Sequence, residues 1–264
     1  MINIENLHFS YDTPGTGKVT ALKSVNLTIH EGENIGLIGA NSSGKTTLVR
    51  CLNSLLVPSS GKITVDGLDT SEPQNSVNIR RKVGMVFQNP DNQIVSATVE
   101  REIAFGLENL GVPTEKMRTI VEKTLNTFDL IQYRTHPPYL LSGGEKQRLA
   151  LAAVMAMEPK YLILDEPTSL LDPRGRDSIV DLIKAIHRKN KNKEVTSRVT
   201  TVFITQYPEE MLSVDRLLVM NQGIIIMDDD PEIIFNRLDE LQKIGLQAPV
   251  EFELDKLFKK YDIK

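Results

Sequence analysis

The sequence of 264 residues contains one cysteine and no tryptophan, and aromatic residues make up 5% of it. A single cysteine cannot form an intrachain disulfide, which excludes the disulfide-stapled class of small secreted domains and suits a reducing compartment. Cys51 lies in a segment with helical apolar spacing. We therefore expect it to be a small core residue and not a reactive thiol.

Long hydrophobic runs are also missing. No uninterrupted apolar stretch approaches the roughly 18 residues that cross a bilayer, and residues 1–5 have neither the basic region nor the apolar core of a signal peptide. The net charge of −4 gives no global positive field for nucleic acid. We expect a cytosolic chain without a nucleic-acid partner, which could reach a membrane only through another protein.

What remains is ordinary for a large α/β domain, with 40% hydrophobic and 25% charged residues. Alternating and β-branched residues predict a pair of antiparallel strands near the N-terminus, and short apolar runs predict buried strands. The antiparallel pair spans residues 2–11 and 19–29. The buried runs are 34–38, 63–65, 83–87, 161–164 and 201–205.

Helical spacing of apolar residues begins after Lys45 and recurs in five later segments, 99–110, 114–128, 177–186, 232–244 and 251–261. The polar, mostly basic stretch 188–198 indicates a solvated loop. We therefore expect an α/β domain over 1–230, with a helical insertion at about 89–160. A short C-terminal helical appendage follows at 231–264.

Residues 39–46 fit the complete G-x-x-x-x-G-K-[ST] phosphate-loop pattern, between a predicted strand and a predicted helix. Backbone N–H groups of such a loop point at phosphate oxygens, and the helix adds the positive end of its dipole. Lys45 would reach the β- and γ-phosphates, and the Thr46 hydroxyl would bind Mg²⁺. The predicted nucleotide-binding residues are Gly39, Ala40, Asn41, Ser42, Ser43, Gly44, Lys45, Thr46 and Thr47.

Two acids follow the fully apolar segment 161–164. Asp165 would hold Mg²⁺ through a water molecule, and Glu166 would polarise the attacking water. The pair alone could equally cap a helix, since Pro167 and Thr168 follow. The phosphate loop in the same chain favours the catalytic interpretation.

A second anion-binding segment lies at residues 141–145, Leu-Ser-Gly-Gly-Glu. Ser142 would cap a helix that starts near Glu145, and the exposed amides of Gly143 and Gly144 would face a phosphate. A plain helix cap is the alternative. One γ-phosphate does not need two such sites in one domain, whereas a head-to-tail dimer does, with each signature facing the partner's phosphate loop.

In order and spacing these motifs resemble the nucleotide-binding subunits of ABC transporters, over about residues 2–230. The resemblance implies a P-loop NTPase core with an N-terminal antiparallel subdomain, ATP and Mg²⁺ as ligands, and ATP hydrolysis. It also implies that Tyr11 stacks on adenine, that Gln88 touches Mg²⁺ and water, and that Asp172 crosses the dimer interface. An ordinary strand tyrosine is the alternative for Tyr11.

Two further segments, 87–93 and 98–109, resemble the ATPases of energy-coupling factor (ECF) transporters, which are similar to cobalt and nickel importer ATPases. The tail 244–249 fits that group's C-terminal extension. This resemblance implies a second ABC ATPase subunit, a transmembrane coupling protein, and a separate membrane protein that captures a vitamin or metal ion. It places the chain on the cytoplasmic face of the membrane.

The sequence departs from the family pattern at two positions. Ser42 stands where glycine is usual, so it must adopt a negative φ or tolerate strain. Gln206 stands where the family has a histidine that contacts the γ-phosphate and the catalytic glutamate. Glutamine can donate a hydrogen bond but carries no charge and cannot shuttle a proton. This difference favours a heterodimer in which the site of this chain is the slower one.

Two other functions remain open from the sequence. A soluble ABC ATPase acting on DNA or ribosomes usually shows duplicated cassettes, a long coiled coil or a basic surface, and none is evident here. A regulatory nucleotide-binding module without useful turnover is supported by Gln206 and opposed by Glu166 and Lys45.

Overall fold

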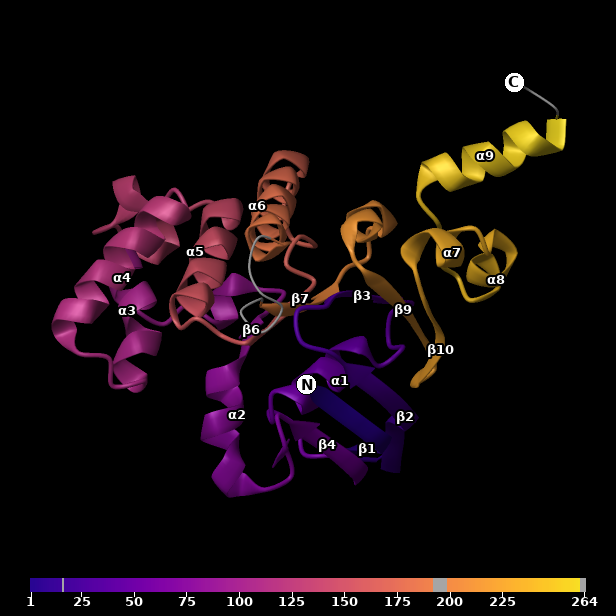
Figure 1. The fold of residues 1–264 in the computed structure, drawn as a ribbon, viewed down its shortest axis with the longest axis horizontal. Helices are drawn as coiled ribbons and strands as arrows, with labels where there is room; N and C mark the ends of the chain where they lie inside the picture. The colour runs from indigo at the N-terminus through magenta and orange to yellow at the C-terminus, as the bar shows by residue number, and fades with distance from the viewer. Residues whose placement is uncertain (16, 192–198, 262–264) are drawn as a thin grey trace.

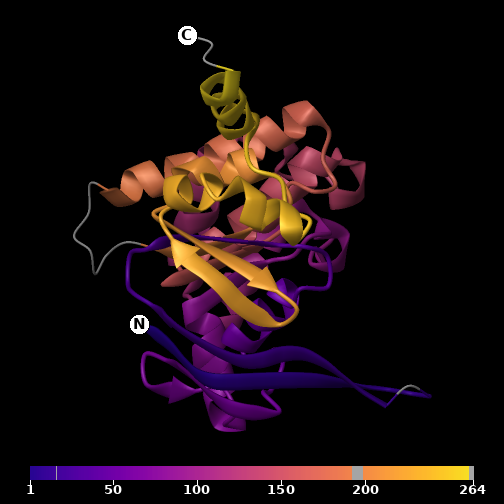
Figure 2. The same cartoon turned by 90° about the vertical axis from the view of Figure 1, so that its right-hand side faces the viewer.

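The structure is a computed structural model of the chain that describes residues 1–15, 17–191 and 199–261. It combines a six-stranded sheet, a smaller four-stranded sheet and helices on either side of them (Figures 1 and 2). The strands are β1 (Ile2–Thr13), β2 (Gly17–Ile29), β3 (Asn34–Gly39), β4 (Ser60–Val65), β5 (Leu68–Asp69), β6 (Val83–Val86), β7 (Tyr161–Asp165), β8 (Thr200–Ile204), β9 (Arg216–Asn221) and β10 (Ile224–Asp229). The α-helices are α1 (Lys45–Leu52), α2 (Ser76–Lys82), α3 (Val99–Asn109), α4 (Thr114–Thr127), α5 (Gly143–Ala156), α6 (Pro173–Lys191), α7 (Pro231–Phe235), α8 (Leu238–Lys243) and α9 (Val250–Tyr261).

The larger sheet has the strand order β10-β9-β3-β8-β7-β6. Its strands from β9 to β6 are parallel, and β10 runs antiparallel to β9 at one edge. Strands β3, β7 and β8 are buried along their whole length, as expected for apolar strands covered on both faces. Their carboxyl ends lie at one edge of the sheet, where open α/β sheets bind ligands.

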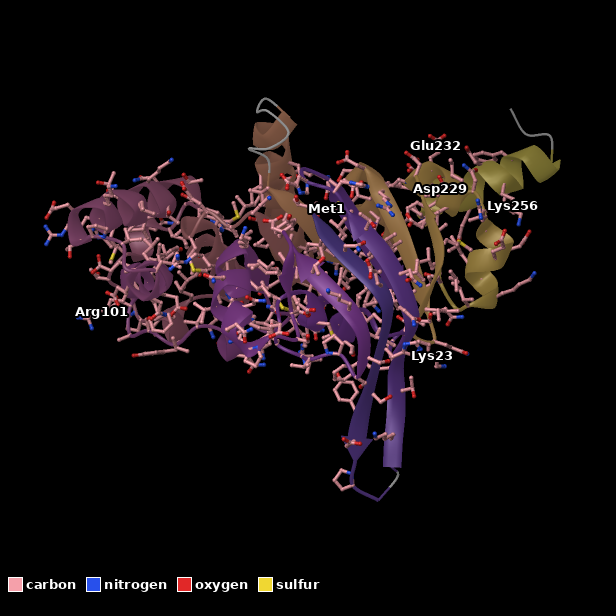
Figure 3. All side chains as sticks on the ribbon, turned by 60° about the horizontal axis from the view of Figure 1, so that its bottom comes forward. Met1, Lys23, Arg101, Asp229, Glu232 and Lys256 are labelled. Carbon is pink, nitrogen blue, oxygen red and sulfur yellow. The ribbon has the colours of Figure 1, made fainter. Side chains whose placement is uncertain are left out.

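The smaller sheet is antiparallel, with the order β2-β1-β4-β5. The far end of the β1–β2 hairpin projects beyond the body of the molecule (Figure 3). One apolar cluster joins this sheet to α1 and one face of the larger sheet. Cys51 belongs to that cluster and is fully buried, which confirms its predicted place in the core. Burial also raises the pKa of its thiol to about 12.

A second apolar cluster covers the other face of the larger sheet with α3, α4, α5 and α6. The side chains of α7 and α8 belong to the same cluster, and Phe252, at the start of α9, packs against it. By contrast, α9 extends away from the body (Figure 1). Among the described residues, no helix has the length and apolar character needed to traverse a bilayer.

The sequence predicted the α/β class and the main strands and helices, with shifts of a few residues at their ends. One helix was predicted wrongly, because residues 232–244 form the two short helices α7 and α8. The Asn236 side-chain amide donates to the carbonyl oxygen of Glu232 (2.7 Å), and Arg237 leaves helical geometry. Such local side-chain bonds compete with helix propagation. The predicted loop 188–198 is helical through Lys191 and otherwise falls outside the described residues.

Strands β9 and β10 were not predicted. They form a hairpin whose two turn residues, Gln222 and Gly223, both have positive φ (47° and 85°). Two positive φ values are typical of a tight two-residue hairpin turn, whose backbone twist matches the twist of the flanking strands. The chain does carry a glycine at the second position of this turn, which is the signal that could have revealed the hairpin.

Candidate functional site

The phosphate loop follows the carboxyl end of β3 and leads into α1, as predicted from the sequence. Lys45 is 5% exposed, and its Nζ donates to the carbonyl oxygens of Gly39 (2.7 Å) and Ala40 (3.1 Å). Burial lowers the pKa of Lys45, while the nearby charges of Glu166 and Asp165 act in the opposite direction. The ammonium group is therefore folded back against the carbonyl oxygens of its own loop.

Two residues of this loop have left-handed backbone geometry, Ser42 with a φ of 64° and Gly44 with a φ of 108°. The φ of Ser42 shows which of the two conformations expected from the sequence this residue adopts. Ser42 has a positive φ and not a negative one. This strained conformation costs roughly 1–3 kcal/mol for a non-glycine residue. The loop therefore keeps its turn without the usual glycine.

The β9–β10 turn is hydrogen-bonded to the phosphate loop. The sequence did not indicate this contact. The Gly223 amide donates to the Ser43 carbonyl (2.9 Å), and the Gly223 carbonyl accepts from the Lys23 amide (2.8 Å). A Cβ atom at Gly223 would lie 2.6 Å from the carbonyl oxygen of Ala21. The turn can lie this close to β2 only because residue 223 has no side chain.

Replacing Gly223 with alanine is expected to weaken nucleotide binding about tenfold. The substitution forces both a clash with Ala21 and a positive φ on a residue with a Cβ, and each strains the turn by roughly 1 kcal/mol or more. Titration with a fluorescent ATP analogue measures the effect, and Gly111→Ala serves as the control, since a Cβ at that left-handed surface glycine meets no neighbour. Equal affinities for the two variants would show that the turn does not support the loop.

The two acids predicted after β7 lie beside the phosphate loop. Asp165 is 3% exposed and its Oδ1 accepts from the Thr46 hydroxyl (3.1 Å). Burial raises the pKa of Asp165, and the Thr46 hydrogen bond acts against that shift. Glu166 is 8% exposed and has a positive φ of 50°. Strain of this kind at a non-glycine residue is typical of functional positions.

Two side-chain amides converge on one oxygen of Glu166. Gln88, after β6, donates from Nε2 to Glu166 Oε2 (3.0 Å), and Gln206, after β8, donates to the same oxygen (2.8 Å). Gln88 also donates to the Ser169 hydroxyl (3.1 Å), a partner that the sequence did not suggest. Segments after β3, β6, β7 and β8 thus meet at one edge of the sheet, with Glu166 at the centre.

Tyr11 lies near the end of β1, where it pairs with Val19 of β2, and is 40% exposed. Its hydroxyl is 3.1 Å from the Thr47 hydroxyl, and its ring packs edge-on against Phe9 at a centroid distance of 4.9 Å. The tyrosine is therefore held next to the phosphate loop with part of its ring open to solvent, where a flat base could stack.

The signature segment caps α5 through a capping box. The Ser142 hydroxyl accepts from the Glu145 amide (3.4 Å), and the Glu145 carboxylate accepts from the Ser142 amide (2.8 Å). The predicted cap is confirmed, but the helix begins at Gly143, two residues before the predicted start. A hydrogen bond from Tyr133 is the main reason why the pKa of Glu145 is lowered.

The phosphate loop and the signature segment border different hollows of the surface. A hollow of about 310 Å³ is lined by Gly39, Ala40 and Asn41 together with Gln206 and Gln247. Another, of about 500 Å³, is lined by residues 142–145 and by the loop that carries Asp172. The hollows share no lining residue, so the signature is not part of the chain's own phosphate site in this structure.

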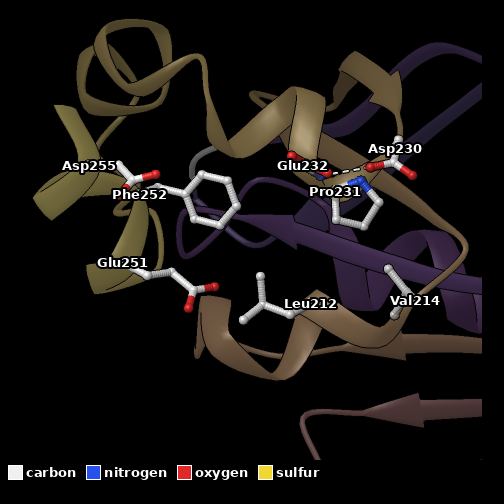
Figure 4. A pocket seen from close by; sticks show the side chains of 8 residues that line it. All are labelled: Leu212, Val214, Asp230, Pro231, Glu232, Glu251, Phe252 and Asp255. Carbon is white, nitrogen blue, oxygen red and sulfur yellow. Dashed lines mark hydrogen bonds between the residues drawn. The ribbon is translucent and has the colours of Figure 1, made fainter. Parts of the chain in front are cut away.

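A third hollow, of about 690 Å³, lies between residues 212–214, the start of α7 and α9 (Figure 4). Four carboxylates line it, and none comes from the phosphate loop or from the signature. Asp230 and Glu232 have a local role there, because the Asp230 carboxylate caps α7 by accepting from the Glu232 amide (2.8 Å). This groove is separate from the nucleotide chemistry. Its acidic residues are Asp230, Glu232, Glu251 and Asp255.

Comparison with known families gives one clear match. The family model described as "ABC transporter" matches residues 22–169, which include the phosphate loop, the signature and both acids. The chain is 42% identical to an "Energy-coupling factor transporter ATP-binding protein EcfA1" from Caldanaerobacter subterraneus subsp. tengcongensis, over 96% of this chain and 89% of the relative. It is 45% identical to a "Cobalt import ATP-binding protein CbiO" from Syntrophus aciditrophicus, over 94% and 85% of the two chains.

Solved structures agree with this assignment. The chain superposes on cbiO1 from Clostridium perfringens, described as part of the ABC transporter complex cbiONQ, with a TM-score of 0.78 and 32% identity. The superposition covers 97% of this chain and 98% of that one. It also matches the dimeric ATP-binding cassette MJ0796 bound to ADP and Pi, with a TM-score of 0.77 and 27% identity over 88% and 99% of the chains.

Proposed function

The chain belongs to the ABC transporter family of ATP-binding proteins, and from this premise we propose that it binds and hydrolyses ATP to power an importer of the energy-coupling factor type. The observation that carries the proposal is the convergence of Lys45, Glu166 and two glutamine amides at one edge of the parallel sheet. The regulatory module without turnover does not explain why two side-chain amides donate to one carboxylate oxygen of Glu166.

In the proposed reaction, the phosphate loop binds the ATP phosphates through its amides and Lys45, and Tyr11 stacks on the adenine. Glu166 takes up the proton of the attacking water, acting as a general base. Gln88 and Gln206 orient its carboxylate through their hydrogen bonds to Oε2. Asp172 lies in the interface loop, where its carboxylate accepts from the Gly175 amide (3.0 Å) and shapes the start of α6.

The residues present also fit a magnesium ion. Thr46 and Asp165 present oxygen atoms 3.1 Å apart beside the phosphate loop, which are the hard ligands that Mg²⁺ prefers. The described part of the chain holds no group of three or more His, Cys, Asp or Glu side chains arranged as a metal cage, and Mg²⁺ commonly completes its shell with phosphates and water. We propose Thr46, Gln88 and, through water, Asp165 as its ligands. The ion would neutralise charge on the transferring phosphoryl group.

We propose that two ATPase subunits pair head-to-tail, with residues 142–145 of each subunit completing the nucleotide site of the other. The separation of the two hollows supports this arrangement. The pair would act on a transmembrane coupling protein and a substrate-capture membrane protein at the cytoplasmic face of the membrane. We further propose residues 1–230 as the ATPase domain, with 89–160 as its helical insertion and 231–264 as its extension.

Co-purification tests this function directly. The tagged full chain, extracted from membranes with mild detergent, is expected to bring down an integral membrane protein and a second ABC ATPase, and the complex is expected to hydrolyse ATP. Mass spectrometry of the captured proteins identifies the partners. Recovery of ribosomal proteins or nucleic acid, with no membrane protein, would favour the soluble ABC ATPase instead.

Replacing Gln206 with histidine is expected to raise the turnover of the site about fivefold. Gln206 already donates to Glu166, but a charge-assisted hydrogen bond contributes roughly 1 kcal/mol more than a neutral one, and 1.4 kcal/mol corresponds to a factor of about ten in rate. ATPase assays of the assembled complex measure the change. Unchanged turnover and uptake would mean that glutamine does not slow this site, and the asymmetry argument for a heterodimer would fail.

A further inference from the structure

A buried carboxyl group lies next to the segments that carry Glu166 and Gln206. It belongs to none of the sequence motifs and has no role in the proposed reaction. Glu210 is 7% exposed and lies in the 3-10 segment η6 (Pro208–Ser213), four residues after Gln206. A carboxyl group removed from water to this degree is costly unless neighbouring groups compensate it. The groups around Glu210 are therefore expected to compensate the cost of its burial.

The neighbours of Glu210 are the residues that follow Glu166 and precede Gln206. The Thr168 hydroxyl, which is fully buried two positions after Glu166, donates to Glu210 Oε2 (3.1 Å). The hydroxyl of Thr205, which is 2% exposed, also lowers the pKa of this carboxyl group. Burial raises the pKa of Glu210, and both threonine hydroxyls act against that shift. One carboxyl group thus ties together the two strand ends that deliver Glu166 and Gln206.

A cation from the interface loop reaches the same place. Arg176 lies in the first turn of α6, and its amide donates to the carbonyl oxygen of Asp172 (2.9 Å). Its guanidinium carbon lies 3.5 Å from the ring centroid of Tyr207, the residue after Gln206. A guanidinium stacked on an aromatic face is attracted by the ring. Helix α6, and with it the interface loop, therefore rests directly on the segment that holds Gln206.

Two complementary atoms in this cluster are left without partners. Glu210 Oε1 and Arg176 Nε are both buried and make no hydrogen bond among the described residues. The charge of Arg176 nevertheless favours the ionised form of Glu210. Buried polar atoms without partners are rare in native structures and call for an explanation. An acceptor and a donor of opposite charge, both unpaired, indicate an ion pair that closes when α6 shifts.

We propose that Glu210 is a positioning residue for Glu166 and Gln206, and that Arg176 pairs with it when a second subunit engages the interface loop. This inference rests on the proposed ATPase function and deepens it. Contact at Asp172 would move the start of α6, bring Arg176 onto Glu210, and fix the two strand ends in the geometry for water attack. Hydrolysis at this site would then depend on the arrival of the partner subunit and not on ATP alone.

The test is a double-mutant cycle in the complex purified with its membrane partners. Glu210→Gln keeps shape and an acceptor for the threonines but removes the charge, and Arg176→Gln removes the cation. We expect each variant to lower kcat about tenfold with KM for ATP unchanged, and the double variant to be no slower than the slower single one. The controls are Glu209→Gln and Arg174→Gln, since both of these neighbouring side chains are exposed.

Thermal unfolding separates positioning from a purely structural role, because a structural defect would lower the unfolding midpoint and raise KM together with the loss of kcat. If Glu210→Gln fails to fold, Arg176→Gln alone still tests the coupling. Variants as active as their controls, or a double variant whose loss is the product of the two single losses, would overturn the inference. Absent turnover in the unmodified complex would instead refute the proposed function itself.

Discussion

Replacing Glu166 with glutamine is expected to lower ATP turnover by about 10²–10⁴-fold, the range that a positioned general base contributes, while ATP binding is retained. The glutamine side chain keeps an oxygen that can accept from Gln88 and Gln206, which now donate at 3.0 and 2.8 Å. What is lost is the ability to accept a proton from water. Phosphate release by the assembled complex measures the change.

The same variant should accumulate the closed dimer with ATP bound, since closure precedes hydrolysis and reopening follows it. Size-exclusion chromatography with MgATP then gives a larger species than the unmodified protein does. Glu72→Gln, at an exposed position, is the matched control. Normal turnover in the Glu166 variant would remove this residue from the catalytic role and return the acid pair to the alternative of a simple helix cap.

Replacing Lys45 with alanine is expected to weaken ATP binding about 100-fold. A hydrogen bond to a charged group contributes roughly 1.5–3 kcal/mol, and each 1.4 kcal/mol changes affinity tenfold. Titration of the purified chain with a fluorescent ATP analogue measures the loss. Lys116→Ala, on the exposed surface of α4, serves as the control.

The stability of the Lys45 variant distinguishes loss of a ligand contact from loss of the fold. Burial lowers the pKa of Lys45, so its folded-state pKa lies below that of the unfolded chain, and the charged ammonium opposes folding without nucleotide. That penalty is present at neutral pH and fades only as the pH rises toward the unfolded pKa. The unfolding midpoint of the free variant should therefore not fall. A lower midpoint together with unchanged ATP affinity would contradict the role given to Lys45.

The sequence was sufficient to predict the residues that belong to a short local motif. The phosphate loop, the acids after β7 and the capping box at Ser142 each depend on a short segment with a defined pattern. The parallel strands were also predictable, because they are continuous apolar runs, and their adjacency explains why Gln88 and Gln206 meet at Glu166. These side chains are 78 and 40 residues away from Glu166 along the chain.

Contacts between distant segments were not predictable in this way. Gly223 donates to Ser43 from the turn of the β9–β10 hairpin, and the sequence does not show that this turn lies against the phosphate loop. Glu210 looks in sequence like half of an exposed acidic pair, yet the fold buries it against Thr168. Its neighbour Glu209 has the same chemistry and is exposed, so local composition could not separate the two.

The backbone conformation of Ser42 was also not predictable from the sequence. The sequence left two backbone conformations open for Ser42, and the structure shows the positive φ. A φ of 64° is disfavoured for a residue with a Cβ, so the local preference of serine would have predicted the other conformation.

The central claim is that residues 39–46 and residues 142–145 serve different ATP molecules. Gly143→Asp tests it, because a carboxylate at the first position of α5 favours the helix dipole and repels phosphate from the signature. A Cβ at Gly143 meets only the Leu171 side chain, at 3.6 Å. The decisive measurement is the affinity of the isolated Gly143→Asp chain for a fluorescent ATP analogue, with turnover of the complex measured in parallel. We expect an affinity equal to that of the unmodified chain and a loss of turnover in the complex. An affinity that falls as far as in Lys45→Ala would mean that the signature binds the chain's own ATP, and would contradict the claim.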